Sequence, residues 1–181
     1  MPRRPVPLLL AFATAAAVTV SLTGCVGGGA DSPSPKPTAS KSALFSSDEE
    51  ALKAAEKAYQ AYLDVTNKVG HGGWKDSSDL ASVMEGDLLK TETAGAKDFA
   101  ARGYVLLGDS SMDSMRVQSA RPPVVVYVCR DVSKTDVVDS SGKSIVPAER
   151  QSRVPLQVTF GDRDGTLIVS RSVTWSGDDF C

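Results

Sequence analysis

The hydrophobic pattern of the chain changes its period once, at Gly103, and this change constrains the fold more than any other feature. Between residues 47 and 102, apolar residues recur at helical spacing, as in amphipathic helices. From Tyr104 to Trp175, apolar and polar residues alternate in short runs, as in strands that bury one face. Helices followed by strands are typical of an α+β domain. We therefore predict N-terminal helices packed on one face of an antiparallel sheet.

The helical half is expected to contain one long helix and two shorter ones. Ser47 and Glu50 have the spacing of a capping box, in which each side chain satisfies a free backbone N–H at the start of a helix. The long helix is predicted to begin there and to end before Gly70. A second helix is predicted over 77–84, and a third helix is predicted to end at Arg102.

The second half of the chain contains five candidate strands. They lie at 104–107, 112–119, 124–132, 154–160 and 167–175. Pro155 has no N–H for a ladder hydrogen bond, so its strand is expected at a sheet edge or at a bulge. The polar run Asp162–Gly165 is predicted to be the hairpin turn between the last two strands.

The first 25 residues are organised like an export signal. Arg3 and Arg4 form a short positive region, and the run from Val6 to Leu22 carries no charge. Residues 22–25, Leu-Thr-Gly-Cys, resemble the lipobox of bacterial lipoproteins, whose cysteine thiol takes a diacylglyceryl group and becomes the new N-terminus. We predict a lipoprotein signal peptide over 1–24 and lipidation at Cys25. The other interpretation is an ordinary cleaved signal in which this cysteine is incidental.

The segment from 25 to 46 separates this signal from the predicted domain at 47–181. It is rich in Gly, Ser and Pro and has no apolar period, so we expect a flexible linker. Two or more acyl chains on one cysteine anchor a protein stably to a lipid bilayer. The protein is therefore expected at the extracytoplasmic face of a bacterial cell membrane, anchored by lipid and not spanning the bilayer.

Lipidation of Cys25 would leave Cys129 and Cys181 as an even pair. An even pair in an exported domain favours one disulfide. The other interpretation is a redox-active or metal-binding pair, but the chain has no further thiol and a single histidine to complete such a site.

Charge and motifs exclude several classes of function. The chain has 20 basic and 22 acidic residues, so we expect no nucleic-acid partner. The single histidine, His71, has no metal-ligand cluster around it, and we expect no metal and no cofactor. Residues 106–111, Leu-Leu-Gly-Asp-Ser-Ser, imitate the nucleophile block of GDSL-type hydrolases. Such enzymes need a histidine downstream, whereas Asn67 and His71 lie upstream, so a strand followed by a turn is predicted instead.

The second half of the chain also resembles a known family. Its first long strand carries Val-Tyr-Val-Cys-Arg-Asp at 126–131, followed by a turn at Asp139–Gly142 and a terminal Cys181. Together with the preceding helices, these features are similar to actinobacterial secreted lipoproteins with a nuclear transport factor 2-like, or cystatin-like, cone fold. The resemblance implies a curved sheet around the long helix, a conical pocket and homodimerisation through the open sheet face. Most such proteins have no assigned activity.

Four aromatic residues and one arginine are candidates to line such a pocket: Tyr59, Tyr62, Trp74, Arg171 and Trp175. Arg171 is in phase with the apolar residues of the last strand, so it is expected at the pocket or its rim. The other interpretation makes the aromatic residues ordinary core and places Arg171 at an edge.

The predicted function is a binding or interaction module with a small ligand or a protein partner, more a binding protein than an enzyme. The alternative is an enzyme similar to ketosteroid isomerases or polyketide cyclases, which use a pocket carboxylate as a general base. Asp131 is the candidate base for that alternative. A carboxylate within hydrogen-bond reach of a pocket tyrosine would favour it.

Overall fold

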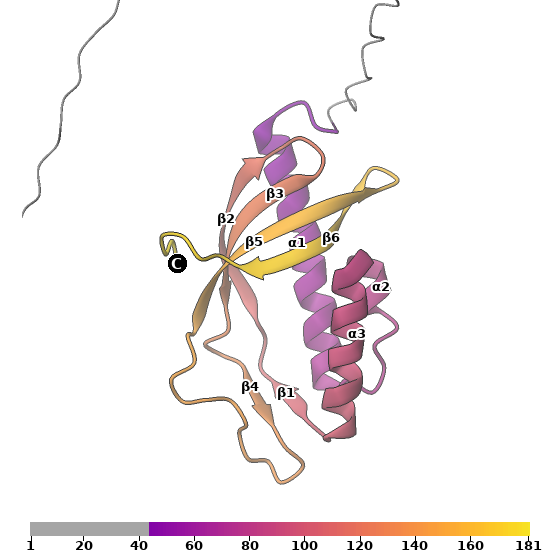
Figure 1. The fold of residues 1–181 in the computed structure, drawn as a ribbon, viewed down its shortest axis with the longest axis vertical. Coiled ribbons are helices and arrows are strands. Elements are labelled where there is room, and N and C mark those ends of the chain that lie inside the picture. The colour runs from indigo at the N-terminus through magenta and orange to yellow at the C-terminus, as the bar shows by residue number, and fades with distance from the viewer. Residues whose placement is uncertain (1–43) are drawn as a thin grey trace, which may run out of the picture. The chain divides into compact units, whose positions relative to one another are not determined.

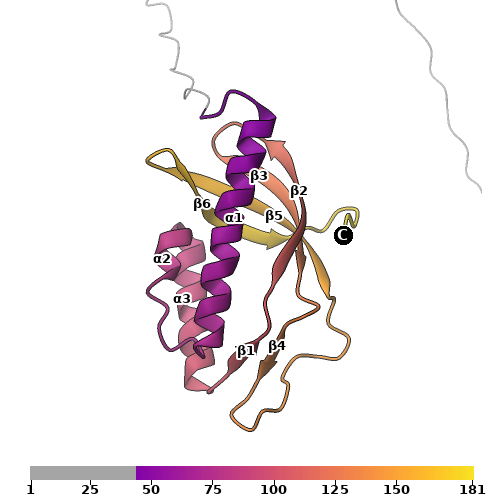
Figure 2. The same ribbon diagram turned by 180° about the vertical axis from the view of Figure 1, so that it is seen from behind.

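The computed structural model describes residues 44–181, and Figures 1 and 2 show their arrangement from two sides. Three helices come first: α1 (Asp48–His71), α2 (Leu80–Val83) and α3 (Gly86–Ala101). Six strands follow: β1 (Val105–Leu107), β2 (Ser111–Ser119), β3 (Val124–Asp131), β4 (Asp136–Val138), β5 (Arg153–Arg163) and β6 (Thr166–Thr174). The helices pack against antiparallel strands, which confirms the predicted α+β class. The predicted signal peptide, Cys25 and nearly all of the linker lie outside the described residues.

Helix α1 begins where the capping pattern predicts and ends later than expected. Ser47 is the N-cap, and its hydroxyl accepts a hydrogen bond from Glu50 N at 3.2 Å. The Glu50 carboxylate accepts from Ser46 N at 2.8 Å, one residue earlier than in the standard box. The helix continues through Gly70, which is buried. This glycine is needed for packing, because without a side chain it lets Leu106 lie directly against the helix backbone.

The strands form two sheets. Strands β2, β3, β5 and β6 form a four-stranded antiparallel meander in that spatial order, and β1 pairs with β4 in a separate two-stranded sheet. The sequence pattern did not predict β4, which is only three residues long. Within residues 44–181, no helix is long and apolar enough to cross a lipid bilayer.

Helix α1 packs along one face of the four-stranded sheet, as both ribbon views show. Most inward side chains in the middle of the two central strands are fully buried there, among them Val126 of β3 and Phe160 of β5. They meet the fully buried Tyr59 and Leu63 of α1. Burial of each such side chain contributes about 1.5–3 kcal/mol, so this interface holds the helix on the sheet.

A bulge in the β5–β6 ladder changes which residues of β6 face the helices. Phe160 pairs with Val169, whereas Thr159 pairs with Arg171, so β6 has one extra residue at this point. The extra residue reverses the alternation of β6. Val169 is therefore fully buried, while Arg171 shares the outer face of the sheet with Thr159 and is exposed. The expectation that Arg171 lies in phase with all apolar residues of this strand was wrong.

Strand β5 is an inner strand, so the prediction that Pro155 marks an edge or a bulge was also wrong. Pro155 pairs with Cys129 of β3, and its carbonyl accepts a hydrogen bond from Trp175 N at 2.8 Å. The N and O atoms of one strand residue point to the same side. The position of the missing N–H therefore points to the β6 side of β5, where β6 has already ended at Thr174. The hydrogen bonds between β5 and β3 do not need this N–H.

Cys129 and Cys181 form the predicted disulfide, with Cα atoms 5.4 Å apart. Cys129 and Tyr127 belong to the face of β3 that points away from α1, because they alternate with the inward Val126 and Val128. The disulfide thus fixes the C-terminal tail, residues 175–181, to the outer face of the sheet.

Candidate functional site

An open groove of about 490 Å³ lies between the second half of α1 and the segment that joins β1 to β2. Its lining is polar and consists of Gln60, Asp64, Asn67, Lys68, His71, Asp109, Ser110 and Ser111. Gln60, Asp64, Asn67 or Lys68, and His71 follow one another at intervals of three or four positions, which places them on one face of the helix. The groove therefore presents a helix face on one wall and a short loop on the other.

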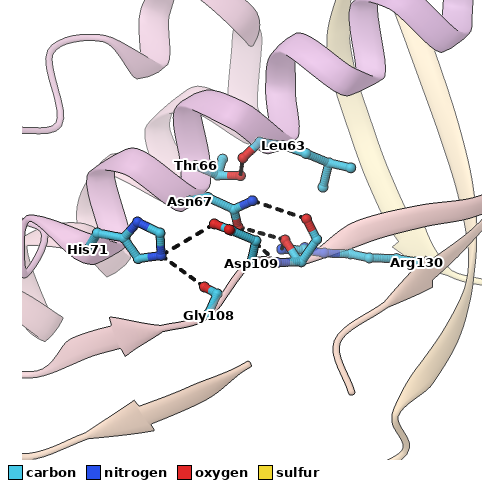
Figure 3. Close-up of polar contacts among 8 residues, drawn as sticks. Leu63, Thr66, Asn67, His71, Gly108, Asp109 and Arg130 are labelled. Atoms are coloured by element: carbon cyan, nitrogen blue, oxygen red, sulfur yellow. Dashed lines mark hydrogen bonds and ion pairs between the residues drawn. The ribbon is translucent and has the colours of Figure 1, made fainter. Parts of the chain in front are cut away.

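The loop wall is fixed by a single buried amide, that of Asn67, which is 7% exposed. Its Nδ2 atom donates to Ser110 O at 3.0 Å, and its Oδ1 atom accepts from Ser110 N at 3.1 Å and from Ser110 Oγ at 2.9 Å. Figure 3 shows these bonds between the helix and the loop. The Asn67 side chain thus binds both the N–H and the C=O of Ser110, which lies 43 positions away. A neighbouring strand would satisfy the same two backbone groups.

Arg130 of β3 completes this network from the sheet side. Its Nη2 atom donates to Ser110 Oγ at 3.0 Å. Its Nε atom is buried and has no hydrogen-bond partner among the described residues. A partly buried guanidinium favours nearby negative charge and nearby oxygen lone pairs. Its charge acts to lower the pKa of both Tyr59 and Tyr62, although burial dominates and raises the pKa of each.

His71, in the last turn of α1, contacts the same loop at the two residues that precede Ser110. Its Nε2 atom lies 2.9 Å from Gly108 O and 3.4 Å from Asp109 Oδ1 (Figure 3). A carbonyl oxygen can only accept, so Nε2 carries a proton. Gly108 has φ +67°, and a side chain there would collide with Lys134 O. The loop can therefore pass between α1 and the β3–β4 connection only with glycine at this position.

The groove brings Ser110 of the GDSL-like segment close to Asn67, His71 and Asp109, but not in the arrangement of a hydrolase site. Ser110 is 4% exposed, donates to Asn67 and accepts from Arg130. His71 uses Nε2 to donate to a carbonyl. Within residues 44–181, no hydrogen bond joins a serine to His71, and the Ser110 hydroxyl instead donates to the Asn67 amide oxygen. The predicted strand followed by a turn is present here, as β1 and the loop to β2.

The exposed part of the groove is suited to reversible binding. Asp64 and Asp109 are exposed and provide acceptor oxygens, and Gln60 Nε2 donates to Asp64 Oδ1 at 2.8 Å. Lys68 is turned toward Asp79 on another segment, 2.8 Å away. Hydrogen bonding to Asp79 raises the pKa of Lys68. The walls therefore offer more free acceptors than free donors.

The five residues predicted to line one pocket are not brought together. Tyr59 and Tyr62 are buried core residues whose rings stack at 5.4 Å between centroids. Trp74 packs edge-on against Phe99 of α3, at 4.8 Å. Arg171 and Trp175 lie on the side of the sheet away from α1, Arg171 exposed and Trp175 half-buried. The interpretation of the aromatic residues as core fits the tyrosines.

Asp131, the candidate base of the enzyme alternative, lies at the end of β3 in a turn. Its Oδ1 atom accepts from Ser133 N at 2.7 Å, and this bond lowers the pKa of the carboxyl. Among residues 44–181, no carboxylate is hydrogen-bonded to a tyrosine, and no three His, Cys, Asp or Glu side chains are grouped to hold a metal ion.

Sequence reasoning missed the clamp formed by Asn67, Ser110 and Arg130. The signal was the single asparagine of the chain, within the predicted long amphipathic helix. A buried amide needs partners, so such a position predicts a polar contact, but nothing in the sequence says which loop supplies it.

No family model and no curated protein matches the chain. Among solved structures, the intermembrane space region of the chloroplast protein ARC6 is similar, with a TM-score of 0.50 and 14% identity. The match covers 70% of this chain and 97% of that one. A de novo designed β-sheet protein matches with a TM-score of 0.33 and 14% identity, over 73% of this chain and 92% of the design. At such identity the first likeness concerns the fold alone.

Proposed function

We propose that this protein is an extracytoplasmic lipoprotein whose folded domain is a binding module, with the groove between α1 and the Gly108–Ser111 loop as its ligand site. In this proposal Cys25 carries the lipid anchor and the linker connects it to the domain. The ligand is a small polar molecule with hydroxyl or amino groups, because the groove offers free carboxylate oxygens at Asp64 and Asp109.

The observation that supports this function is that the backbone of the groove's loop is held rigidly, whereas the side chains that face the groove are free to bind a ligand. Asn67 and Arg130 hold the loop from behind through bonds that involve no ligand. The side chains that face the groove, including Asp109, are exposed and make few contacts with the rest of the protein. A rigid backbone with free polar side chains is pre-organised for binding, which reduces the entropy lost when a ligand binds.

The ligand site is tested by a thermal-shift screen of the purified full chain against sugars, amino acids, polyamines and cell-wall fragments. A ligand at 100 times its Kd stabilises the native state by about 2.7 kcal/mol, which should raise Tm by roughly 8–10 °C for a domain of this size. Asp109→Asn should abolish the shift. The control is Asp87→Asn, which changes an exposed aspartate of α3 whose one side-chain bond is to Lys90. A shift that persists in Asp109→Asn contradicts the groove assignment.

The anchor is tested by expressing the full chain in bacteria fed an alkyne-labelled fatty acid. The protein should take up the label and fractionate with membranes. Cys25→Ser should lose both properties, whereas Cys181→Ser should keep both. An unlabelled wild-type chain, or a labelled Cys25→Ser variant, contradicts lipidation at this residue.

The enzyme alternative would now rest on Glu92 of α3 rather than on Asp131. Partial burial raises the pKa of Glu92, although the charge of Arg130 opposes the shift and the residue as a whole is exposed. It lines a cavity of about 120 Å³ between α1 and α3, together with Thr66, Trp74 and Phe99. A raised carboxyl pKa is the property of a general base, but a cavity this small does not admit a substrate of the isomerase class. Binding therefore remains our proposal.

Homodimerisation through the outer face of the sheet also stays a prediction. The C-terminal tail already lies on part of that face, around Tyr127. Light scattering of the purified chain at rising concentration would measure the oligomeric state, and a monomer throughout would contradict the prediction.

A further inference from the structure

Three aromatic rings meet on the outer face of the sheet, on the opposite side from α1. Tyr127 of β3 lies between Trp175, which follows β6, and Phe180 of the tail. The ring centroids of Tyr127 and Trp175 are 4.8 Å apart and those of Tyr127 and Phe180 are 5.7 Å apart, with interplanar angles of 64° and 59°. With Arg116, Asp178 and Asp179, these rings line a cavity of about 330 Å³, which we call the aromatic cage.

The cage is held in place by the covalent and backbone structure around it. Phe180 precedes Cys181, whose disulfide partner Cys129 is two residues from Tyr127 on the same face of β3. Trp175 N donates to Pro155 O at 2.8 Å. Gly177 lies against the indole so closely that a Cβ there would come within 2.5 Å of the ring. The rings are therefore pre-organised, with little freedom left for a ligand to remove.

The electrostatics of the cage favour a positive ligand. The faces of aromatic rings carry negative potential and attract cations within about 6 Å of the centroid. Arg116 already uses one such face, with its guanidinium carbon 5.2 Å from the centroid of Phe180. Asp178 and Asp179 are exposed at the cavity, so its lining carries two carboxylates against one guanidinium.

We infer that the aromatic cage binds an alkylated ammonium group, such as the trimethylammonium group of a small soluble molecule. A lysine-type ammonium is strongly hydrated and would lose water against these rings. A trimethylammonium group is weakly hydrated, and its bulk lets it contact more than one ring at a time. The site is separate from the groove of the proposed function and does not depend on it.

The test uses the full chain carrying Trp74→Phe, which leaves Trp175 as its single tryptophan. Choline is titrated while the tryptophan fluorescence is recorded, and calorimetry gives Kd independently. The matched ligand is 3,3-dimethylbutan-1-ol, in which carbon replaces the charged nitrogen. Choline should change the fluorescence and bind at least about five-fold more tightly than the alcohol, as a cation–π contribution of this kind requires. Equal affinities for choline and the alcohol would overturn the inference. So would the absence of choline binding at about 100 mM, which is 100-fold above a weak Kd of about 1 mM.

Two substitutions move the affinity in opposite directions. Trp175→Leu should weaken choline binding at least about five-fold by calorimetry, and Trp175→Phe should weaken it less because a ring remains. Arg116→Gln should strengthen binding by about two- to five-fold, because it removes a cation that competes for the Phe180 face. A loss of affinity in Arg116→Gln would contradict the inference, whatever the Trp175 variants do.

Discussion

The clamp between Asn67 and Ser110 predicts a large loss of stability from one small substitution. In Asn67→Ala, Ser110 N and Ser110 O lose their partners in a region that is 4–7% exposed. Each buried group left without a partner costs about 1–3 kcal/mol, while Ser110 Oγ keeps its bond from Arg130. We expect the free energy of unfolding to fall by about 2–5 kcal/mol, a large part of the roughly 5–15 kcal/mol of a typical domain.

Urea unfolding of the full chain measures this loss, with the midpoint and the slope fitted separately. The matched control is Gln60→Ala, two turns earlier on the same face of α1, where the side chain is exposed and bonds only to Asp64. The control should stay within about 0.5 kcal/mol of the wild type. A loss below about 1 kcal/mol in Asn67→Ala would mean that water replaces the amide, and the reasoning from burial would be refuted.

Three further predictions concern other parts of the domain. Replacing Cys129 and Cys181 together by serine should lower the free energy of unfolding by about 4 kcal/mol, because the disulfide closes a loop between residues 52 positions apart; urea unfolding of the wild type with reductant should match the double variant. Tyr59→Phe should stabilise the protein by about 1 kcal/mol in the same assay, because the buried hydroxyl of Tyr59 has no partner among the described residues. Burial raises the pKa of Tyr59, so the stability present below about pH 10 is lost as the pH rises toward the folded-state pKa, and Tyr59→Phe should flatten this alkaline loss. Gly108→Ala should cost at least about 2 kcal/mol, whereas Gly142→Ala, with a similar positive φ but open space around it, should cost only about 1 kcal/mol; equal losses would show that φ alone matters.

The elements were predictable because their signals are local. The capping residues of α1, the alternation in β5 and the hairpin turn before β6 lie within a few positions of the structure they specify. The disulfide was predictable for a different reason, because assigning Cys25 to the predicted lipid anchor left Cys129 and Cys181 as the remaining pair.

The candidate site was not predictable, because it depends on contacts between distant residues. Asn67 and Ser110 are 43 positions apart, and no periodicity relates them. The phase of Arg171 relative to Leu167 and Val169 was predicted wrongly, because one extra residue in β6 reverses every later side chain and a bulge leaves no clear mark in the sequence. Pro155 was misplaced because a missing N–H matters only if a strand lies on that side, which is a property of the sheet.

The two proposed sites depend on different bonds, so they can be separated by one perturbation. The groove is held by hydrogen bonds from Asn67 and Arg130, which reduction leaves intact. The aromatic cage needs Phe180 beside Tyr127, and the disulfide at Cys181 is the covalent link that keeps it there. Mild reduction without urea should therefore abolish choline binding and leave the thermal shift from a groove ligand in place. If reduction abolished both choline binding and the thermal shift from a groove ligand, the cause would be destabilisation of the whole domain. Release of the C-terminal tail would then not explain the loss of choline binding.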